Sequence, residues 1–245
     1  MKKILFLLFI TTAINVHADD LSKFTILDYY KNAESIIKQR YYPIFLKDSK
    51  YKFKTTMGYE DYATVDIKNG FIEIKDGGTG ASSYVTELAL FIDKKNNHFI
   101  AINIYDQGEG FTSTLQFGIY TFNGKQWYDI TLNKIPILPI EEFYSNSKQN
   151  NFYKIRREIA STFKLDNFYY KLPREGLNIT VQVCDKCLHF ANRIYQDRDF
   201  INISNTLDNI GMKEFEKILF QWNSNKSKFE LTNKEKFIPF NQKNK

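Results

Sequence analysis

The residues best suited to redox or metal chemistry are the two cysteines of the chain, Cys184 and Cys187, with His189 close behind them. A thioredoxin-type pair needs its first cysteine at a helix N-terminus within an alternating α/β fold, which the surrounding sequence does not predict. A zinc site needs four ligands, and this stretch supplies three. A disulfide needs no further residue. We therefore predict a structural disulfide between Cys184 and Cys187, with redox and zinc chemistry as alternatives, and we expect no cofactor and no metal site.

Two glycine-containing loops are the candidate binding sites. The stretch KDGGTGASS leads into a strand-like pattern and not into the helix that a phosphate-binding loop requires. The stretch YDQGEGF holds two carboxylates, too few for the six to eight oxygens that bind calcium. Because loops often carry binding residues, we predict that both loops lie at one end of a sheet and form a binding edge. The residues concerned are Asp76, Gly77, Gly78, Thr79, Asp106, Gln107, Glu109 and Phe111.

Motifs of the common hydrolases do not occur in the sequence. It has no Gly-x-Ser-x-Gly elbow, no His-Glu-x-x-His and no Ser-x-x-Lys with a Lys-Thr-Gly box. After removal of a leader, His98 and His189 are the remaining histidines, and we expect ordinary surface or structural roles for both. Acidic pairs such as Glu141–Glu142 would act on glycosides only if the fold set the right separation. The sequence therefore favours a protein that is not an enzyme.

Residues 1–18 have the features of a secretory leader. Lys2 and Lys3 precede an apolar run, Ile4 to Ile10, and small residues lead to a cleavage site after Ala18. The run is shorter than the roughly 20 residues that a membrane-spanning helix needs. We therefore predict a periplasmic or secreted protein that begins at Asp19 and is not stably inserted in the membrane. In such an oxidising compartment cysteines are expected to pair.

The charge of the mature chain is mild. Loss of two leader lysines lowers the formal net charge from +6 to +4, with 32 basic side chains against 28 acidic ones. Lysines and acids are interleaved, without the basic stripe that follows a nucleic-acid backbone. We predict no nucleic-acid partner.

The elements that would position these residues are mainly strands. Three pairs of alternating stretches turn at Asn69–Gly70, at Lys94–Asn97 and at Asn123–Gly124, and Asn-Gly is the dipeptide best suited to a tight hairpin. Six strands joined by short turns predict an antiparallel meander. The side chains expected to face inward are Ile72, Ile74, Leu88, Leu90, Ile100, Ile102, Leu115, Phe117 and Ile119.

Two segments have helical periodicity. The first begins at Thr25 or Asp28 and ends before Pro43, and the second has apolar residues at helical intervals from Phe152 to Phe163. We predict that both cover the sheet. The fold class is therefore α+β, a predominantly antiparallel β meander of hairpins with two or three covering helices.

A polar, proline-flanked stretch divides the mature chain. We expect residues 19–144 to form the N-terminal helix and hairpin sheet. Residues 152–245 are expected to form a mixed α/β part that contains the Cys184–Cys187 loop and packs with the first as one unit. The later stretch LFQWNSNKSKFELT has the pattern of a further hairpin.

The hairpin stretches resemble a group of uncharacterised exported bacterial β-meander proteins. The resemblance is carried by LALFIDKKNNHFIAINIYDQGEG, FGIYTFNGKQWYDIT, YYKLPREGLNITV and ILFQWNSNKSKFEL, and the region from Cys184 to Met212 departs from it as an insertion. It implies the fold and carries no activity to this chain.

These observations lead to one functional hypothesis and two alternatives. A rigid hairpin sheet with many tyrosines suits an interface, so we expect an exported non-catalytic binding protein, such as a periplasmic inhibitor or immunity protein that caps another protein of the cell envelope. One alternative is a periplasmic hydrolase whose carboxylates converge only in the fold. The other is a thiol-linked protein that works through Cys184 and Cys187.

Overall fold

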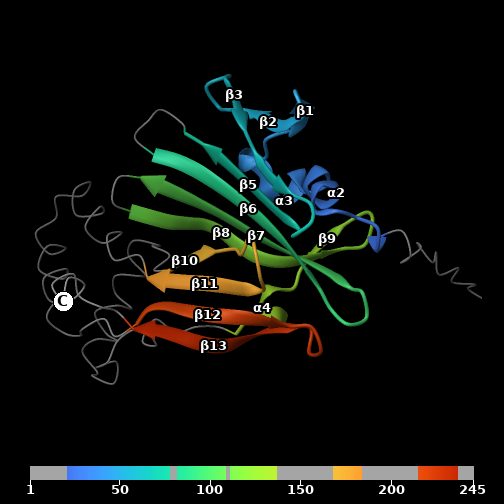
Figure 1. The fold of residues 1–245 in the computed structure, drawn as a ribbon, viewed down its shortest axis with the longest axis vertical. Helices are drawn as coiled ribbons and strands as arrows, with labels where there is room; N and C mark the ends of the chain where they lie inside the picture. Colours follow the sequence, from blue (N-terminus) through green and yellow to red (C-terminus); the bar gives the residue numbers. More distant parts are fainter. Residues whose placement is uncertain (1–20, 78–81, 109–110, 137–167, 184–214, 237–245) are drawn as a thin grey trace, which may run out of the picture.

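The protein is built mainly of antiparallel β-sheet (Figure 1). In this computed structural model the described residues are 21–77, 82–108, 111–136, 168–183 and 215–236. They form a three-stranded, a six-stranded and a four-stranded sheet. The strands are β1 (Phe45–Lys47), β2 (Lys50–Lys54), β3 (Glu60–Tyr62), β4 (Thr64–Asp66), β5 (Phe71–Asp76), β6 (Ser82–Ile92), β7 (His98–Gly108), β8 (Phe111–Phe122), β9 (Trp127–Asp129), β10 (Phe168–Lys171), β11 (Asn178–Val183), β12 (Phe215–Asn223) and β13 (Lys228–Lys236).

The predicted six-stranded meander is confirmed. Strands β4 to β9 lie in sequence order, and each pairs antiparallel with the next. The two Asn-Gly turns are longer than predicted, because each connects its strands through four residues and not two. In these two turns only the glycines have positive φ, +66° for Gly70 and +92° for Gly124. A two-residue type I′ turn would also require positive φ at the asparagine.

The predicted inward-facing set is divided between two faces of this sheet. Ile72, Leu88 and Ile102 are buried on the face that the N-terminal helices cover. Ile119 is paired with Ala101 and is buried on the opposite face, against the four-stranded sheet. Both faces are therefore covered, which explains the nearly continuous apolar run of β6.

Leu115 was predicted to face inward, and this prediction is wrong. Ile104 pairs with Gln116 and Tyr105 pairs with Thr114, so Leu115 is an extra residue between two ladder pairs of β7 and β8. A bulge of this kind turns its extra side chain out of the alternation. The Leu115 side chain is 52% exposed.

The first predicted helix is present in shorter pieces. Helices α2 (Ile26–Lys31), α3 (Glu34–Ile37) and the 3-10 turn η1 (Lys38–Arg40) replace one continuous helix. Thr25, one of the two predicted starts, caps α2 in a capping box with Asp28. The break follows Lys31, because Asn32 caps the end of α2 and donates its side-chain amide to the backbone carbonyl of Asp28. Helix α4 (Thr131–Lys134) is also short, and none of the α-helices in the described ranges exceeds six residues.

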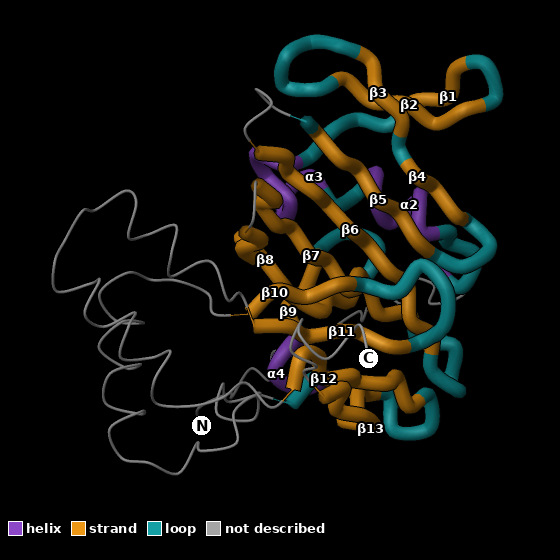
Figure 2. Tube along the Cα trace, turned by 60° about the vertical axis from the view of Figure 1, so that its left-hand side comes forward, coloured by secondary structure: helices purple, strands orange, loops and turns teal. Residues whose placement is uncertain are grey.

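Residues of the second part of the chain share a core with the first. Strands β10 to β13 form an antiparallel sheet that packs on the meander, as Figures 1 and 2 show. Phe91 and Phe99 of the meander contact Trp222, with ring centroids 5.7 and 5.2 Å apart. The described part of this second half is β-sheet, and the predicted helix at Phe152–Phe163 lies outside the described residues.

No helix of the described residues is long and apolar enough to cross a membrane.

Candidate functional site

The two predicted binding loops begin from neighbouring positions of the meander. Asp76 at the end of β5 and Asp106 near the end of β7 pair with Tyr84 on opposite sides of β6. Gln107 and Gly108 follow Asp106 in β7 and pair with the first residues of β6. Gly77 is exposed, the Phe111 side chain is not described, and Gly78, Thr79 and Glu109 lie outside the described residues.

The two carboxylates of this row differ in exposure, since Asp106 is only partly buried. Asp76 is completely buried, and its Oδ2 accepts a hydrogen bond from the Thr56 amide at 2.9 Å. Asp106 Oδ1 is buried without a hydrogen-bond partner among the described residues. Between them the Arg40 guanidinium lies 3.3 Å from the centroid of the Tyr84 ring. Asp76 therefore has a structural role, and the loops stay a prediction as a binding edge.

Glu87 is the buried carboxylate at the centre of the contact between the two large sheets. Its Oε2 accepts hydrogen bonds from Asn103 Nδ2 and from the Leu172 amide, each at 3.0 Å, and Tyr105 donates to Oε1 at 3.3 Å. Asn103 also donates to the carbonyl of Tyr170 at 2.7 Å. The network therefore joins β6 and β7 of the meander to β10 and the residue after it.

The electrostatics of Glu87 are those of a general acid, but its position is closed. Burial raises the pKa of Glu87 to about 7, against the lowering effect of its hydrogen bonds. A raised carboxyl pKa and a neighbouring acid, here Glu73 on β5, are features of catalytic carboxylate pairs. The exposed fraction of Glu87 is 0%, so no substrate reaches it in this conformation. We infer that Glu87 joins the sheets.

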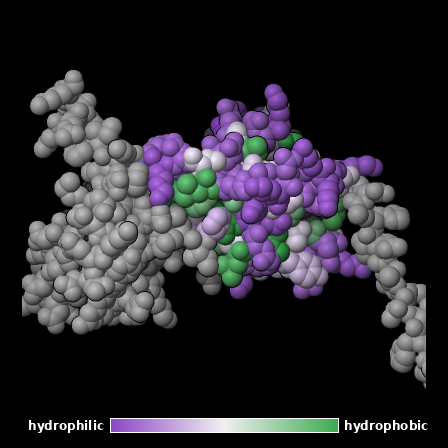
Figure 3. All heavy atoms as spheres, turned by 90° about the horizontal axis from the view of Figure 1, so that it is seen from below, coloured by the Kyte–Doolittle hydropathy of each residue, from purple (hydrophilic) through white to green (hydrophobic). Residues whose placement is uncertain are grey.

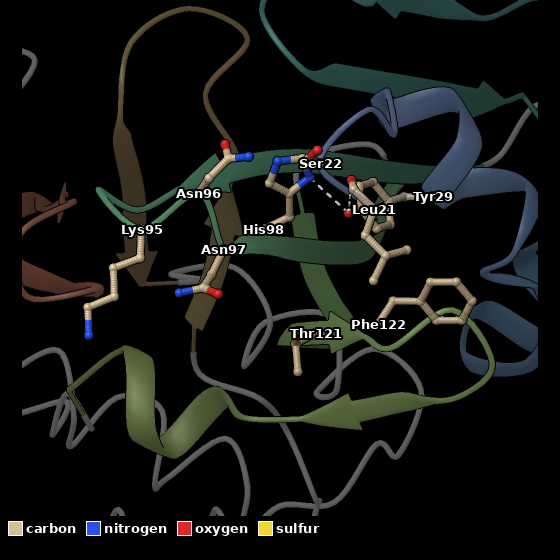
Figure 4. Close-up of a pocket in the computed structure, with 9 residues that line it drawn as sticks. All are labelled: Leu21, Ser22, Tyr29, Lys95, Asn96, Asn97, His98, Thr121 and Phe122. Atoms are coloured by element: carbon tan, nitrogen blue, oxygen red, sulfur yellow. Dashed lines mark hydrogen bonds between the residues drawn. The ribbon is translucent and has the colours of Figure 1, made fainter. Parts of the chain in front are cut away.

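A pocket of about 330 Å³ lies beside α2, at the turn between β6 and β7 (Figure 4). The hydroxyl of Tyr29 and Nδ1 of His98 are 2.9 Å apart, and the same hydroxyl lies 3.3 Å from the carbonyl of Leu21. The remaining lining residues are Ser22, Lys95, Asn96, Asn97, Thr121 and Phe122. Most of these side chains both donate and accept hydrogen bonds, so the pocket suits a small polar molecule.

The Tyr29–His98 pair is neutral near pH 7. Burial lowers the pKa of His98, and burial raises the pKa of Tyr29 to about 12. Asp93 fixes the turn that forms one wall: its carboxylate accepts hydrogen bonds from the amides of Lys95 and Asn97 and from Ser227 Oγ, at 2.8, 2.9 and 2.6 Å. The pocket wall is thus tied to the β12–β13 turn.

The small sheet β1–β2–β3 projects from one end of the meander in both views of the backbone (Figures 1 and 2). Phe53 attaches it to the main core, since its side chain is fully buried and its ring centroid lies 5.4 Å from that of Tyr42. Four large apolar side chains of this segment are instead exposed. They are Leu46 (63%), Met57 (54%), Tyr59 (71%) and Tyr62 (59%).

Comparison with known proteins gives no family for this chain. No family model matches it, and no curated protein matches it. A solved domain of an uncharacterized protein from Porphyromonas gingivalis W83 is similar at a TM-score of 0.43, with 12% sequence identity, over 78% of this chain and 79% of that one. We therefore infer function from the side chains of this protein.

The predicted Cys184, Cys187 and His189 lie outside the described residues. Other features of the candidate sites were not predicted from the sequence. Among the described residues no group of three acids, histidines or cysteines is placed to hold a metal ion. The sequence analysis assigned His98 an ordinary role and no partner, and in the structure it begins β7 and contacts Tyr29, 69 residues earlier. No local pattern signals a contact of that range.

Proposed function

We propose that the protein is an exported, non-catalytic binding protein that caps a partner protein of the cell envelope, as an inhibitor or immunity protein does. The supporting observation is the position of its exposed apolar side chains. Of the eleven large ones in the described part of the chain, four gather in the projecting segment from Phe45 to Tyr62. Clustered exposed apolar groups mark interaction sites, and tyrosine and methionine are enriched at interfaces.

Other exposed apolar side chains are more scattered. Figure 3 shows the molecule from below, where the described surface is mainly hydrophilic with separate hydrophobic patches. Leu132 on α4 and Leu231 on β13 are examples of exposed leucines away from the projecting sheet. Single exposed leucines are ordinary in soluble proteins. The projecting sheet is therefore the best candidate for a protein interface.

Export is part of the same proposal. Cleavage after Ala18 would leave a chain that begins at Asp19, in the compartment where the partner is expected. Intact-mass measurement on protein from the periplasmic or culture fraction tests this point. A leader retained in the membrane fraction would contradict it.

The test of the function is recovery of a stoichiometric partner from the envelope of the producing cell, with the mature protein as bait. The double variant Leu46→Ser/Tyr59→Ser should lose the partner, because it removes the two most exposed apolar side chains of the projecting sheet. The control Leu132→Ser/Tyr128→Ser changes the same residue types elsewhere and should keep it. Failure to recover any partner, or equal loss in both variants, would contradict the proposal.

A further inference from the structure

The outer face of the projecting sheet is rich in lysine. Strand β2 reads Lys-Tyr-Lys-Phe-Lys, and alternation places Lys50, Lys52 and Lys54 on the face opposite the buried Phe53. Register adds Lys47 of β1, which pairs with Lys50. We call the outer face formed by these four lysines with Glu60 and Tyr62 the lysine face.

We propose that the lysine face binds an acidic segment of the partner protein. This inference rests on the proposed function and names the chemistry of the partner. Four lysines and one glutamate give the face a net charge of +3. Asp48 in the β1–β2 turn and Asp61 on the opposite face lower the net charge of residues 45–62 to +1, so the positive charge is concentrated on this one face. Electrostatic complementarity therefore favours an acidic partner for the face.

A carboxylate already lies on this face. Glu60 is held by Lys47 at 2.8 Å and by Lys52 at 3.6 Å. Lys50 and Lys54 form no ion pair with any residue of the described ranges. Because alternate residues of a strand are about 6.6 Å apart, acids at alternate positions of an extended partner segment would match these lysines.

The lysines are not explained by protection of a sheet edge. Edge strands often carry lysine to prevent pairing with other chains, but β2 is the central strand of its sheet. Lys47 and Lys50 are also direct cross-strand neighbours, an arrangement of like charges that destabilises a sheet. A partner carboxylate would relieve this repulsion.

The aromatic residue of the face favours a protein over a nucleic acid. A single-strand binding surface needs aromatic rings that are free to stack on bases. The Nζ atoms of Lys50 and Lys52 lie 5.2 and 5.3 Å from the ring centroid of Tyr62. These cation–π contacts use the ring on which a base would have to stack. Phe45 is half-buried and pairs with Lys52, and Tyr62 is 59% exposed, so both add apolar surface to the lysine face of the kind that a protein interface needs.

The direct test uses a peptide of alternating glutamate and threonine, with glutamine in place of glutamate in the control peptide. Binding to the mature protein is followed by amide NMR shifts and by affinity at two salt concentrations. We expect shifts within Lys47–Tyr62 and an affinity that falls with salt. Lys50→Glu/Lys54→Glu should weaken binding at least about tenfold. The control Lys68→Glu/Lys125→Glu, with the same charge change on two exposed turns, should change affinity less than about twofold.

The outcomes separate this inference from the proposed function. Absence of peptide binding, equal binding of the glutamine peptide, or equal loss in both lysine variants would overturn the inference. Tighter binding of oligothymidylate or phosphatidylglycerol vesicles, lost in Lys50→Glu/Lys54→Glu, would assign the face to phosphate instead. If the envelope partner is retained by Lys50→Glu/Lys54→Glu but lost in Leu46→Ser/Tyr59→Ser, the proposed function stands and the acidic partner does not. If the acidic peptide binds but no partner is recovered from the envelope, the acidic specificity of the lysine face stands and the proposed function does not.

Discussion

Glu87 should make the stability of the protein depend on pH between about 4.5 and 7. Its carboxyl group is fully buried between the two large sheets, and burial raises its pKa from 4.5 to about 7. The groups that face it from the neighbouring strands have smaller effects: Leu172 and Asn103 lower the pKa by donating hydrogen bonds, Glu73 raises it and Lys171 lowers it. Desolvation is the largest effect, so the folded protein favours the protonated acid.

The magnitude follows from the difference between the folded and unfolded pKa values. Because the folded state holds the proton more tightly, the contribution of Glu87 to stability is fully present below pH 4.5. It is lost as the pH rises through about 7, where the acid ionises in the folded protein as well. A difference of about 2.5 pH units corresponds to about 3 kcal/mol of unfolding free energy.

The variant Glu87→Gln isolates this effect. Its amide resembles the neutral acid: the oxygen can accept from Asn103 and Leu172, and the NH₂ group can donate to the Tyr105 hydroxyl. Urea unfolding from pH 4.5 to 8 should find the variant and the wild type similar at the acidic end. At pH 8 the variant should be more stable by about 3 kcal/mol.

Two other titratable groups, His98 and Glu73, must be separated from the effect of Glu87. His98 contributes with the opposite sign, since burial lowers its pKa and its stabilisation is lost as the pH falls. Its contribution is common to both proteins and cancels in their difference. Glu73→Gln removes a carboxylate that raises the pKa of Glu87 but leaves its burial, the largest cause, in place, so this variant should keep most of the wild-type pH dependence. If Glu87→Gln shows the same fall in stability with pH as the wild type, burial of Glu87 does not control its ionisation.

Two further predictions concern the hairpins and the cysteines. Gly70→Val should lower the free energy of unfolding by about 1–3 kcal/mol, because Gly70 has φ +66° and a Cβ there would lie 2.9 Å from Leu90 Cβ. Gly124→Val, at φ +92°, should also lower the melting temperature. An unchanged melting temperature in either variant would contradict the turn assignment. Thiol titration of the native protein should find no free thiol, and a Cys184→Ser/Cys187→Ser variant should fold and melt only slightly lower, because so short a loop contributes less than the roughly 3 kcal/mol of a 15-residue loop. Free thiols in the native protein, or lost partner binding in that variant, would favour the redox interpretation.

The six-stranded meander could be predicted because its signals are local. Alternating side chains and Asn-Gly turns are properties of about ten consecutive residues. The error at Leu115 arose because a bulge inserts one residue without changing the composition of the strand. Ile119 is buried as predicted, but the sequence did not assign it to the second face, because a strand buried on both faces lacks a polar side to distinguish them.

The candidate sites depend on longer-range contacts, which explains why most of them were not predicted. Tyr29 and His98 contact each other across 69 residues, and Leu172 donates to Glu87 across 85. A pattern search sees each of these residues alone, and alone a half-buried histidine or a glutamate in a strand has an ordinary role. Only the packing of α2 and of β10 on the meander brings their partners to them.

The lysine face could be predicted only in part, because it depends both on a local pattern and on contacts between strands. The stretch from Lys50 to Lys54 alternates strictly, so the sequence places its three lysines on one side of any strand it forms. What the sequence does not provide is the neighbouring charge: Lys47 and Glu60 reach the same face only through the register of β1 and β3. Nor does it show that the side opposite the lysines is anchored, which requires Phe53 to enter a core built from α2, α3 and the meander. Burial of Phe53 directs Lys50 and Lys54 to solvent, whereas the Lys52 side chain is only 14% exposed. The projecting position of the sheet leaves the exposed lysines where a partner can reach them.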